Sequence, residues 1–309
     1  MVERVSDARM DALFEKVKNW GRWGDDDERG TLNLLTPEHT ARAARNVVGR
    51  TVNCGRVLPV APSVENPVPA QHMMILAGDA RHGTGVPGAE ACIDYIGLAF
   101  HGLGVSHLDA LCHVFHEGVM YNGRPASDVM STGATRNSVM AMAGGVASRG
   151  VLLDIPRTRG VDWLEPGDGV TPDDLDAACE AQGVQVGPGD ILLVSTGRDA
   201  RREAEGPWDP GHGLAGLDGE CVPWLAERDI AMLGCDGAND IMPPNTNRWP
   251  LPIHVCCLVA MGVHLLDNLD LSGLAAVCEE ERRWEFLFTV SPLQIQGGTG
   301  SPVNPVAVV

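Results

Sequence analysis

The chain has 309 residues, of which 44% are hydrophobic and 21% are charged, and its formal net charge is −18 at pH 7. Such a composition is ordinary for a globular protein, and the negative charge argues against a nucleic-acid partner and against anionic membrane surfaces. No apolar run approaches the roughly 18 residues that cross a bilayer, and the N-terminus is too charged for a secretory signal, so we expect a cytoplasmic protein.

The first part of the chain predicts helices followed by a loop. Residues 7–18 have the one-sided apolar stripe of an amphipathic helix, and Thr36-Pro37-Glu38 has the composition of a second helix start. We therefore expect residues 1–50 to form a helical extension packed on the rest of the protein. Residues 59–88 are rich in proline and are predicted to be mostly loop.

The second half of the chain predicts alternating strands and helices. Short apolar runs at 151–155 and 191–195 are typical of buried strands, and a helix over 171–182 lies between them. This spacing suits a parallel crossover. A further strand is predicted at 230–235 and a helix at 254–262. Together these elements indicate one α/β domain that spans residues 1–309.

One short segment concentrates groups that bind metals or move protons. His101, His107, Asp109, His113 and His116 lie within sixteen residues of one another. Imidazole and carboxylate both ligate metals and exchange protons near neutral pH. His107 and Asp109 are two residues apart, so on a strand they share one face, and His113 continues the even spacing. We expect one extended segment to direct all three into a cleft that forms an active site.

The same segment resembles a known family. The pattern S-H-x-D-x-x-x-H, from Ser106 to His113, is similar to the H-x-G-T-H-x-D-x-P-x-H signature of the cyclase superfamily of metal-dependent hydrolases, which includes bacterial kynurenine formamidase and isatin hydrolase. Further similar blocks begin, in the same order, at Trp20, Arg149, Val186, Leu251 and Gly300. The resemblance implies a swivelling β/α/β cyclase-like fold with a mixed central sheet, and assembly as a homodimer or homotetramer.

The resemblance also implies roles for particular residues. His107 and Asp109 match metal ligands of the signature, and His113 matches its acid/base catalyst. The distal ligands of the family match His254 and Asp267, where Asp267 replaces a glutamate and is one methylene shorter. We therefore expect a divalent cation, Zn²⁺ or Mn²⁺, held by mixed nitrogen and oxygen ligands.

This sequence departs from the signature at its first histidine. Leu103 occupies that position and cannot coordinate a metal. His101 is the nearest replacement, and the flanking Gly102 and Gly104 give the backbone the freedom that a shift would need. The alternative is a site that holds its metal weakly, with water in the vacant position.

Three other residues are candidates for substrate binding. Arg198 follows the strand at 191–195 and could hold a substrate carboxylate, although it could equally pair with a surface aspartate. Asp236 follows the strand at 230–235, where α/β folds often place functional groups, although aspartate is also a common turn former. Trp23 could wall an apolar pocket or belong to the core.

These assignments predict hydrolysis of a small molecule. A bound metal would lower the pKa of water toward 7, and the resulting hydroxide could attack a carbonyl while His113 moves protons. The family resemblance narrows the reaction to the C–N bond of an amide, arylformamide or lactam-like ring. Two alternatives remain: a metal-free hydrolase or lyase on the same scaffold, and a non-catalytic small-molecule binding protein.

Overall fold

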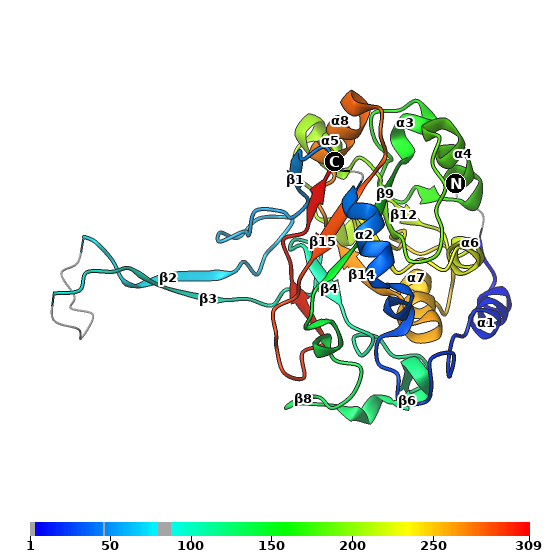
Figure 1. Cartoon of the computed structure of the whole chain (residues 1–309), viewed down its shortest axis with the longest axis horizontal. Helices are drawn as coiled ribbons and strands as arrows, with labels where there is room; N and C mark the ends of the chain where they lie inside the picture. The colour runs from blue at the N-terminus through cyan, green and yellow to red at the C-terminus, as the bar shows by residue number, and fades with distance from the viewer. Residues whose placement is uncertain (1–3, 46, 80–87) are drawn as a thin grey trace.

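The structure, a computed structural model, describes residues 4–45, 47–79 and 88–309. Figure 1 shows a rounded body built on one twisted sheet, with a long two-stranded arm that projects away from it. The nine strands of this sheet lie in the order β1 (Thr51–Asn53), β17 (Val306–Val308), β15 (Glu285–Val290), β9 (Val146–Asp154), β11 (Ile191–Ser195), β13 (Met232–Cys235), β14 (His264–Asp267), β4 (His107–Asp109) and β16 (Gly300–Pro302).

The centre of the sheet is parallel and its two sides are antiparallel. β9, β11, β13 and β14 run parallel to one another, whereas β4 and β15 run antiparallel to the strands beside them. The central strands are mostly buried and mainly apolar, as expected where both faces of a parallel sheet are covered. The predicted α/β fold with a mixed central sheet is therefore confirmed.

Helices cover the sheet on both faces, as Figure 1 shows. The α-helices are α1 (Asp7–Lys16), α2 (Pro37–Arg45), α3 (Ile155–Arg159), α4 (Pro172–Gln182), α5 (Arg198–Glu205), α6 (Cys221–Glu227), α7 (Pro252–His254) and α8 (Ser272–Glu281). The predicted helix over 171–182 begins at Thr171, whose hydroxyl accepts the N–H of Asp174 while the Asp174 carboxylate accepts the N–H of Thr171. Among the described residues, no helix combines the length and apolar character needed to span a bilayer.

The helix predicted at 254–262 has an unexpected pitch. α7 ends at His254, and the chain continues as a fully buried π-helix, η6 (Val255–Met261). The N-terminal segment packs on it: the Trp20 indole N–H donates to the Val259 carbonyl at 2.7 Å, and the Thr31 N–H donates to the Gly262 carbonyl at 2.9 Å. π-Helical turns often mark functional sites, and this one directly follows a predicted metal ligand.

The prediction of a loop over 59–88 is wrong in part. β2 (Gln71–Leu76) pairs antiparallel with β3 (Ile93–Gly97) and forms the projecting arm (Figure 1). Residues 80–87 of the predicted loop lie outside the described part of the chain. The strand was missed because most residues of β2 are exposed on both faces, so its sequence has no alternation of buried and polar positions.

Short elements complete the body. The two-stranded pairs are β5 (Val119–Met120) with β6 (Arg124–Pro125), β7 (Val129–Met130) with β8 (Gly133–Ala134), and β10 (Gly169–Val170) with β12 (Gly216–Leu217). The 3₁₀ turns are η1 (Gly30–Leu34), η2 (Tyr121–Gly123), η3 (Ala126–Asp128), η4 (Val139–Met142) and η5 (Pro210–His212).

Candidate metal centre

Two neighbouring strands place the first three polar groups. On β4, His107 and Asp109 project from one face as their spacing predicts, and His107 Nε2 lies 3.5 Å from Asp109 Oδ1. β14 pairs with β4 so that Asp267 is directly opposite His107. Its Oδ2 lies 3.9 Å from His107 Nε2. Direct cross-strand pairing therefore brings the Asp267 carboxylate close to the His107 ring.

His113 reaches the same carboxylate from a turn. The prediction that one extended segment carries residues 107–113 is wrong, because β4 ends at Asp109 and the His113 N–H donates to the Ala110 carbonyl at 2.9 Å. The turn folds His113 back, and its Nε2 lies 3.8 Å from Asp109 Oδ1.

His254 approaches Asp109 from the opposite side. Its Nε2 lies 3.4 Å from Asp109 Oδ2 and 3.3 Å from Asp267 Oδ2. Asp240 holds the ring, because its Oδ2 lies 2.5 Å from His254 Nδ1. The same carboxylate accepts the backbone N–H groups of Ile253 and His254 at 2.7 and 3.1 Å. Asp240 thus fixes both the start of α7 and the direction in which the His254 ring points.

His101, the predicted replacement for the missing histidine, also contacts Asp109. Its Nδ1 is 3.0 Å from Asp109 Oδ1, and its ring stacks on that of His113 with centroids 3.9 Å apart and planes 5° apart. The following Gly102 has φ 149°, a conformation that other residues rarely adopt. Gly300 passes so close that a Cβ there would lie 2.8 Å from the His101 ring. Both glycines therefore let His101 enter the site.

These residues form what we call the His/Asp cluster: His101, His107, Asp109, His113, His254 and Asp267. Asp109 is fully buried at its centre, and among the described residues neither of its carboxylate oxygens has a hydrogen-bond partner of good geometry. Burial opposes ionisation of Asp109, but the facing imidazoles of His101 and His254 hold its pKa well below the ordinary value. An ionised, buried carboxylate without hydrogen bonds requires a cation nearby.

The two most buried histidines of the cluster, His107 and His254, direct Nε2 toward that carboxylate. Val105 accepts a hydrogen bond from His107 Nδ1 at 2.8 Å, as Asp240 does from His254. When a ring is neutral, its Nε2 is an unprotonated acceptor that faces carboxylate oxygens, and positive charge is then needed between them. A bound cation supplies that charge, and at His254, whose pKa is raised by the neighbouring carboxylates, a proton on Nε2 supplies it when no cation is bound. Metal-binding histidines typically donate their second ring N–H to a carboxylate or carbonyl in this way. The residues present fit a divalent cation.

The cluster contains two groups of ligand atoms that share Asp109. One group comprises His107, Asp109 and Asp267, and the other comprises His101, Asp109 and His113. The first is buried, whereas the side chains of His101 and His113 are 28% and 26% exposed. The second group therefore forms the solvent side of the cluster, from which a substrate would approach.

The electrostatic environment shifts the pKa values of His113 and His254 in opposite directions. Burial lowers the pKa of His113 to about 4, although Asp109 opposes the shift, so its ring is neutral at pH 7 and can accept a proton. Burial would also lower the pKa of His254, but Asp267, Asp109 and Asp240 together raise it well above the ordinary value. The positions that favour positive charge are thus the deep ones, where we expect the metal.

The predicted substrate-binding residues have other partners. The Asp236 carboxylate accepts the N–H groups of Thr196 and Gly197 at 3.0 Å and so holds the turn after β11. Arg198 is buried and donates to Asn268 Oδ1 and to the Leu103 carbonyl, both at 2.7 Å. These contacts explain Asp236 and Arg198 structurally and give no support for substrate binding.

Trp23 has a contact on the N-terminal segment. The guanidinium of Arg22 lies 4.6 Å from its ring centroid. No contact described for Trp23 reaches the His/Asp cluster, so its role in substrate binding stays a prediction.

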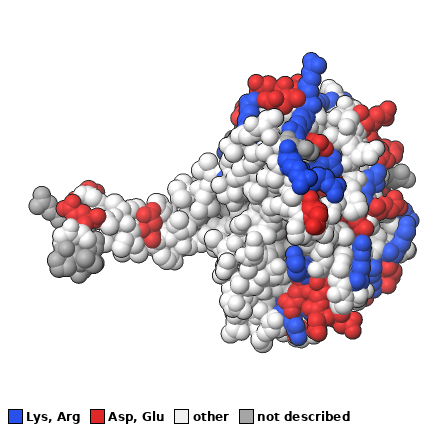
Figure 2. Space-filling view, in the orientation of Figure 1, with Lys and Arg blue, Asp and Glu red and all other residues white. Residues whose placement is uncertain are grey.

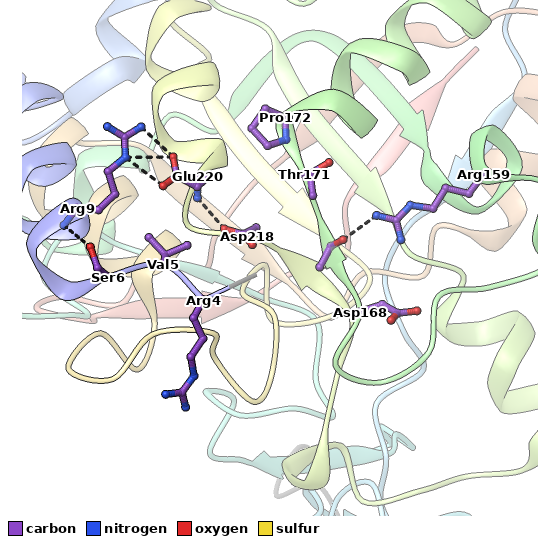
Figure 3. Close-up of a pocket in the computed structure, with 11 residues that line it drawn as sticks. Arg4, Val5, Ser6, Arg9, Arg159, Asp168, Thr171, Pro172, Asp218 and Glu220 are labelled. Atoms are coloured by element: carbon purple, nitrogen blue, oxygen red, sulfur yellow. Dashed lines mark hydrogen bonds and ion pairs between the residues drawn. The ribbon is translucent and has the colours of Figure 1, made fainter. Parts of the chain in front are cut away.

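A large cavity lies elsewhere in the protein. Its volume is about 710 Å³, and its lining includes Ser6, Thr171 and Asp218 but no member of the His/Asp cluster. Figure 3 shows that Arg9 pairs with Glu220 at the rim of this cavity, at 2.9 Å. Because the cavity contains none of the residues of the His/Asp cluster, we assign no reaction to it.

Sequence reasoning missed the residues that orient the ligands. Asp240 and Asn239 are not among the predicted site residues, yet Asp240 orients His254 and the Asn239 amide donates to Asp267 Oδ1 at 2.5 Å. Thr299, whose Oγ1 lies 3.1 Å from His101 Nε2, had no sequence signal. The available clue was the run of Asp and Asn at the carboxyl end of a parallel strand.

Comparisons with known proteins agree with this geometry. The sequence matches the family described as "Putative cyclase" over residues 59–239, which is more than half of the chain. A crystal structure titled a novel cyclase is 33% identical, with a TM-score of 0.86, and the match covers 96% of this chain and 99% of that one. No curated protein matches the sequence.

Isatin hydrolases have a similar fold at lower identity. Isatin hydrolase A from Labrenzia aggregata, bound to benzyl benzoate, is 22% identical with a TM-score of 0.61, and the match covers 84% of this chain and 93% of that one. Isatin hydrolase A from Ralstonia solanacearum is also 22% identical, with a TM-score of 0.58 and coverage of 88% and 95%. At this identity the likeness concerns the fold.

Proposed function

Because this chain belongs to the cyclase family, we propose that it is a metal-dependent hydrolase that cleaves the C–N bond of a small amide, arylformamide or lactam-like molecule. One observation carries the proposal. The buried Asp109 carboxylate lacks hydrogen bonds of good geometry and is faced by Nε2 of His107 and of His254, and each ring is held through its other nitrogen.

The residues of the cluster divide by depth. His107, Asp109, His254 and Asp267 would hold the cation, and His101 would supply the nitrogen that Leu103 cannot. This mixed set of nitrogen and oxygen donors suits Zn²⁺ or Mn²⁺. When bound, such a cation polarises a carbonyl group and lowers the pKa of water toward 7, which supplies the nucleophile for hydrolysis.

His113 would move the proton. Its partly exposed ring is neutral at pH 7, so Nε2 can accept a proton from the attacking water and return it to the leaving nitrogen. The parallel ring of His101 and the turn after β4 keep His113 in this position. His113 therefore acts on the solvent side of the cluster.

The substrate class rests on the chemistry of the site and on relatives. Attack on a carbonyl is the reaction that the proposed metal site and His113 would support together, and amides, formamides and lactams provide such a carbonyl with a nitrogen leaving group. The isatin hydrolases that share the fold are named for opening a lactam ring. Isatin and a simple arylformamide are therefore suitable probes.

The test uses purified protein loaded separately with Zn²⁺ and Mn²⁺. We expect ring opening of isatin or hydrolysis of formanilide, loss of that activity after chelation, and its return when metal is added. Asp109→Asn is the matched inactive variant, because it keeps the side-chain shape and removes the charge. Activity that survives chelation and complete metal removal would contradict the proposal and favour a metal-free hydrolase or lyase. A protein that binds metal but hydrolyses neither probe would contradict the substrate class.

A further inference from the structure

The segment that joins the first two histidines of the His/Asp cluster is held by hydrogen bonds to its backbone carbonyls. The Gly102 carbonyl accepts from the Asn268 amide at 2.7 Å, and the Leu103 carbonyl accepts from Arg198 Nη2 at 2.7 Å. The Asn268 amide also donates to the Val105 carbonyl at 3.2 Å. The segment contains no helix or strand, so these two side chains supply partners that regular structure would otherwise provide.

Arg198 and Asn268 act as one unit, which we call the clamp. Arg198 Nη1 donates to Asn268 Oδ1 at 2.7 Å, so the amide of Asn268 is oriented with Nδ2 toward the segment. Asn268 is fully buried, and its φ of 55° lies in the left-handed region, which asparagine tolerates better than most residues. Arg198 begins α5 soon after β11, and Asn268 directly follows β14. The clamp therefore ties the segment to the central sheet.

The charge of Arg198 has no acidic side chain as its hydrogen-bond acceptor. On the surface of the body, basic and acidic side chains lie beside one another, as Figure 2 shows. Arg198 is only 4% exposed, and among the described residues its side chain donates only to neutral oxygens, which belong to Leu103, Asp236 and Asn268. Burial lowers the pKa of Arg198 to about 10, so the group is still charged at pH 7. A buried charge of this kind costs free energy, whereas its planar fork is well suited to hold two acceptors at once.

The course of the segment determines whether His101 can enter the cluster. His101 is six residues before His107, whereas the first histidine of the family signature is four residues before the second. The backbone must therefore place two additional residues between these side chains. Gly102, with φ 149°, begins this longer path, and Leu103 continues it with its carbonyl toward Arg198. A segment with two glycines has many other courses open to it, and the clamp selects this one.

The His101 ring is held on its far side as well. Its Nε2 lies 3.1 Å from Thr299 Oγ1, and its Nδ1 lies 3.0 Å from Asp109 Oδ1. When Nε2 carries the proton and donates it to Thr299, Nδ1 is free to bind a cation. Thr299 thus directs the ring, while the clamp fixes the backbone behind it.

We propose that Arg198 and Asn268 are positioning residues that place His101 among the metal ligands. This inference rests on the proposed function, because the clamp has this role only if the cluster binds a metal. Both residues act through the backbone of the segment, and contact with substrate is no part of their role. Loss of a residue that orients a ligand typically lowers metal affinity about 10–100-fold, and we expect this range for loss of the clamp.

The first variant is Arg198→Lys, which keeps the charge but replaces the fork by a single, shorter amine. The contacts of Nη1 with Asn268 and of Nη2 with Leu103 are then no longer both made. Arg56→Lys is the matched control, because Arg56 donates to the Asn268 carbonyl at 3.0 Å and pairs with Asp199 at 2.6 Å, yet its side chain does not hold the segment. It should lower thermal stability and leave metal affinity unchanged.

The measurement is competition for Zn²⁺ against a chelator. We expect Arg198→Lys to bind about 10–100-fold more weakly than the wild type. In protein that already carries His101→Ala, Arg198→Lys should cause no further loss, because the clamp acts only through His101. With Co²⁺ as the probe metal, the visible absorption of Arg198→Lys should shift toward that of His101→Ala, whereas Arg56→Lys should keep the wild-type spectrum. A merely structural role for Arg198 would not produce this pattern.

Asn268→Asp provides a second test, which also serves if thermal unfolding shows that Arg198→Lys does not fold. The aspartate keeps an oxygen for Arg198 but removes the N–H groups that the carbonyls of Gly102 and Val105 accept. Its negative charge would by itself attract a cation, so weaker binding can follow only from the lost contacts. We therefore expect weaker Zn²⁺ binding in this variant, again with no further loss when His101→Ala is present.

The outcomes separate this proposal from the proposed function. A wild type that binds no metal would overturn both. A wild type that binds metal, with equal affinity in Arg198→Lys and in Asn268→Asp, would overturn the clamp alone. So would an equal loss of affinity in Arg56→Lys, or a loss by Arg198→Lys that persists in full when His101→Ala is present.

Discussion

Replacement of Asp240 by asparagine tests whether the cluster is built to bind a metal. Asp240 does not face Asp109; it contacts the far side of the His254 ring, where its Oδ2 lies 2.5 Å from Nδ1. Asparagine keeps one acceptor oxygen but removes the charge, and its amide group can turn a donor toward Nδ1. The ring would then be held less firmly, or in the tautomer with the proton on Nε2, where the metal should bind.

The expected magnitude follows from this geometry. Because all the proposed ligands remain, the loss should resemble that for removal of a residue that orients a ligand, which is about 10–100-fold in metal affinity. This range corresponds to about 1.4–2.7 kcal/mol. The loss of a ligand such as His254 itself should cost more. Asp240→Asn is therefore expected to give a weakened site that higher metal concentrations can still fill.

The assay is competition for Zn²⁺ against a chelator of known affinity, combined with thermal unfolding of the metal-free protein. Asp236→Asn is the control: this aspartate is equally buried and accepts several backbone N–H groups, but it does not contact the cluster. It should lower thermal stability and leave metal affinity unchanged. Equal metal affinity for wild type and Asp240→Asn, or equal loss in both variants, would refute the reasoning.

Further substitutions separate the roles within the cluster. His107→Ala or Asp109→Ala should abolish metal binding and activity together, because each removes a direct ligand, and full metal content measured by elemental analysis would exclude that assignment. His113→Ala should keep its metal and lower kcat by ~10²–10⁴, as steady-state kinetics would show; an unchanged kcat would remove His113 from the reaction. His101→Ala should weaken metal affinity in a chelator titration about as much as His107→Ala, and wild-type affinity would show that His101 is not a ligand. In that case Leu103→His should tighten binding by restoring the signature.

The sequence predicts the parts of this site that depend on local geometry. A spacing of two residues placed His107 and Asp109 on one face of a strand, and the structure has them there. The same reasoning failed for His113, because a strand was extended where the chain turns after Asp109. Residues in a tight turn can meet as closely as residues on a strand, and spacing alone does not distinguish the two cases.

Contacts between distant segments could not be predicted in this way. His254 and Asp267 were identified only through the family resemblance, since no local pattern relates them to β4. Asp240 meets His254 because the chain reverses between β13 and α7, and the arm was missed because its apolar residues face solvent on both sides. Alternation of apolar and polar residues predicts a strand only when one of its faces is buried. The apolar side chains of β2 are exposed on both faces, so its sequence lacks that alternation.

The metal content of the purified protein tests the central claim most directly. Elemental analysis after dialysis should find tightly held Zn or Mn in the wild type and none in Asp109→Ala. The metal should be retained at chelator concentrations that remove loosely bound ions, because buried ligands from β4, α7 and β14 surround it. A wild-type protein that holds no more metal than Asp109→Ala, after exposure to both Zn²⁺ and Mn²⁺, would contradict the assignment of the His/Asp cluster as a metal centre.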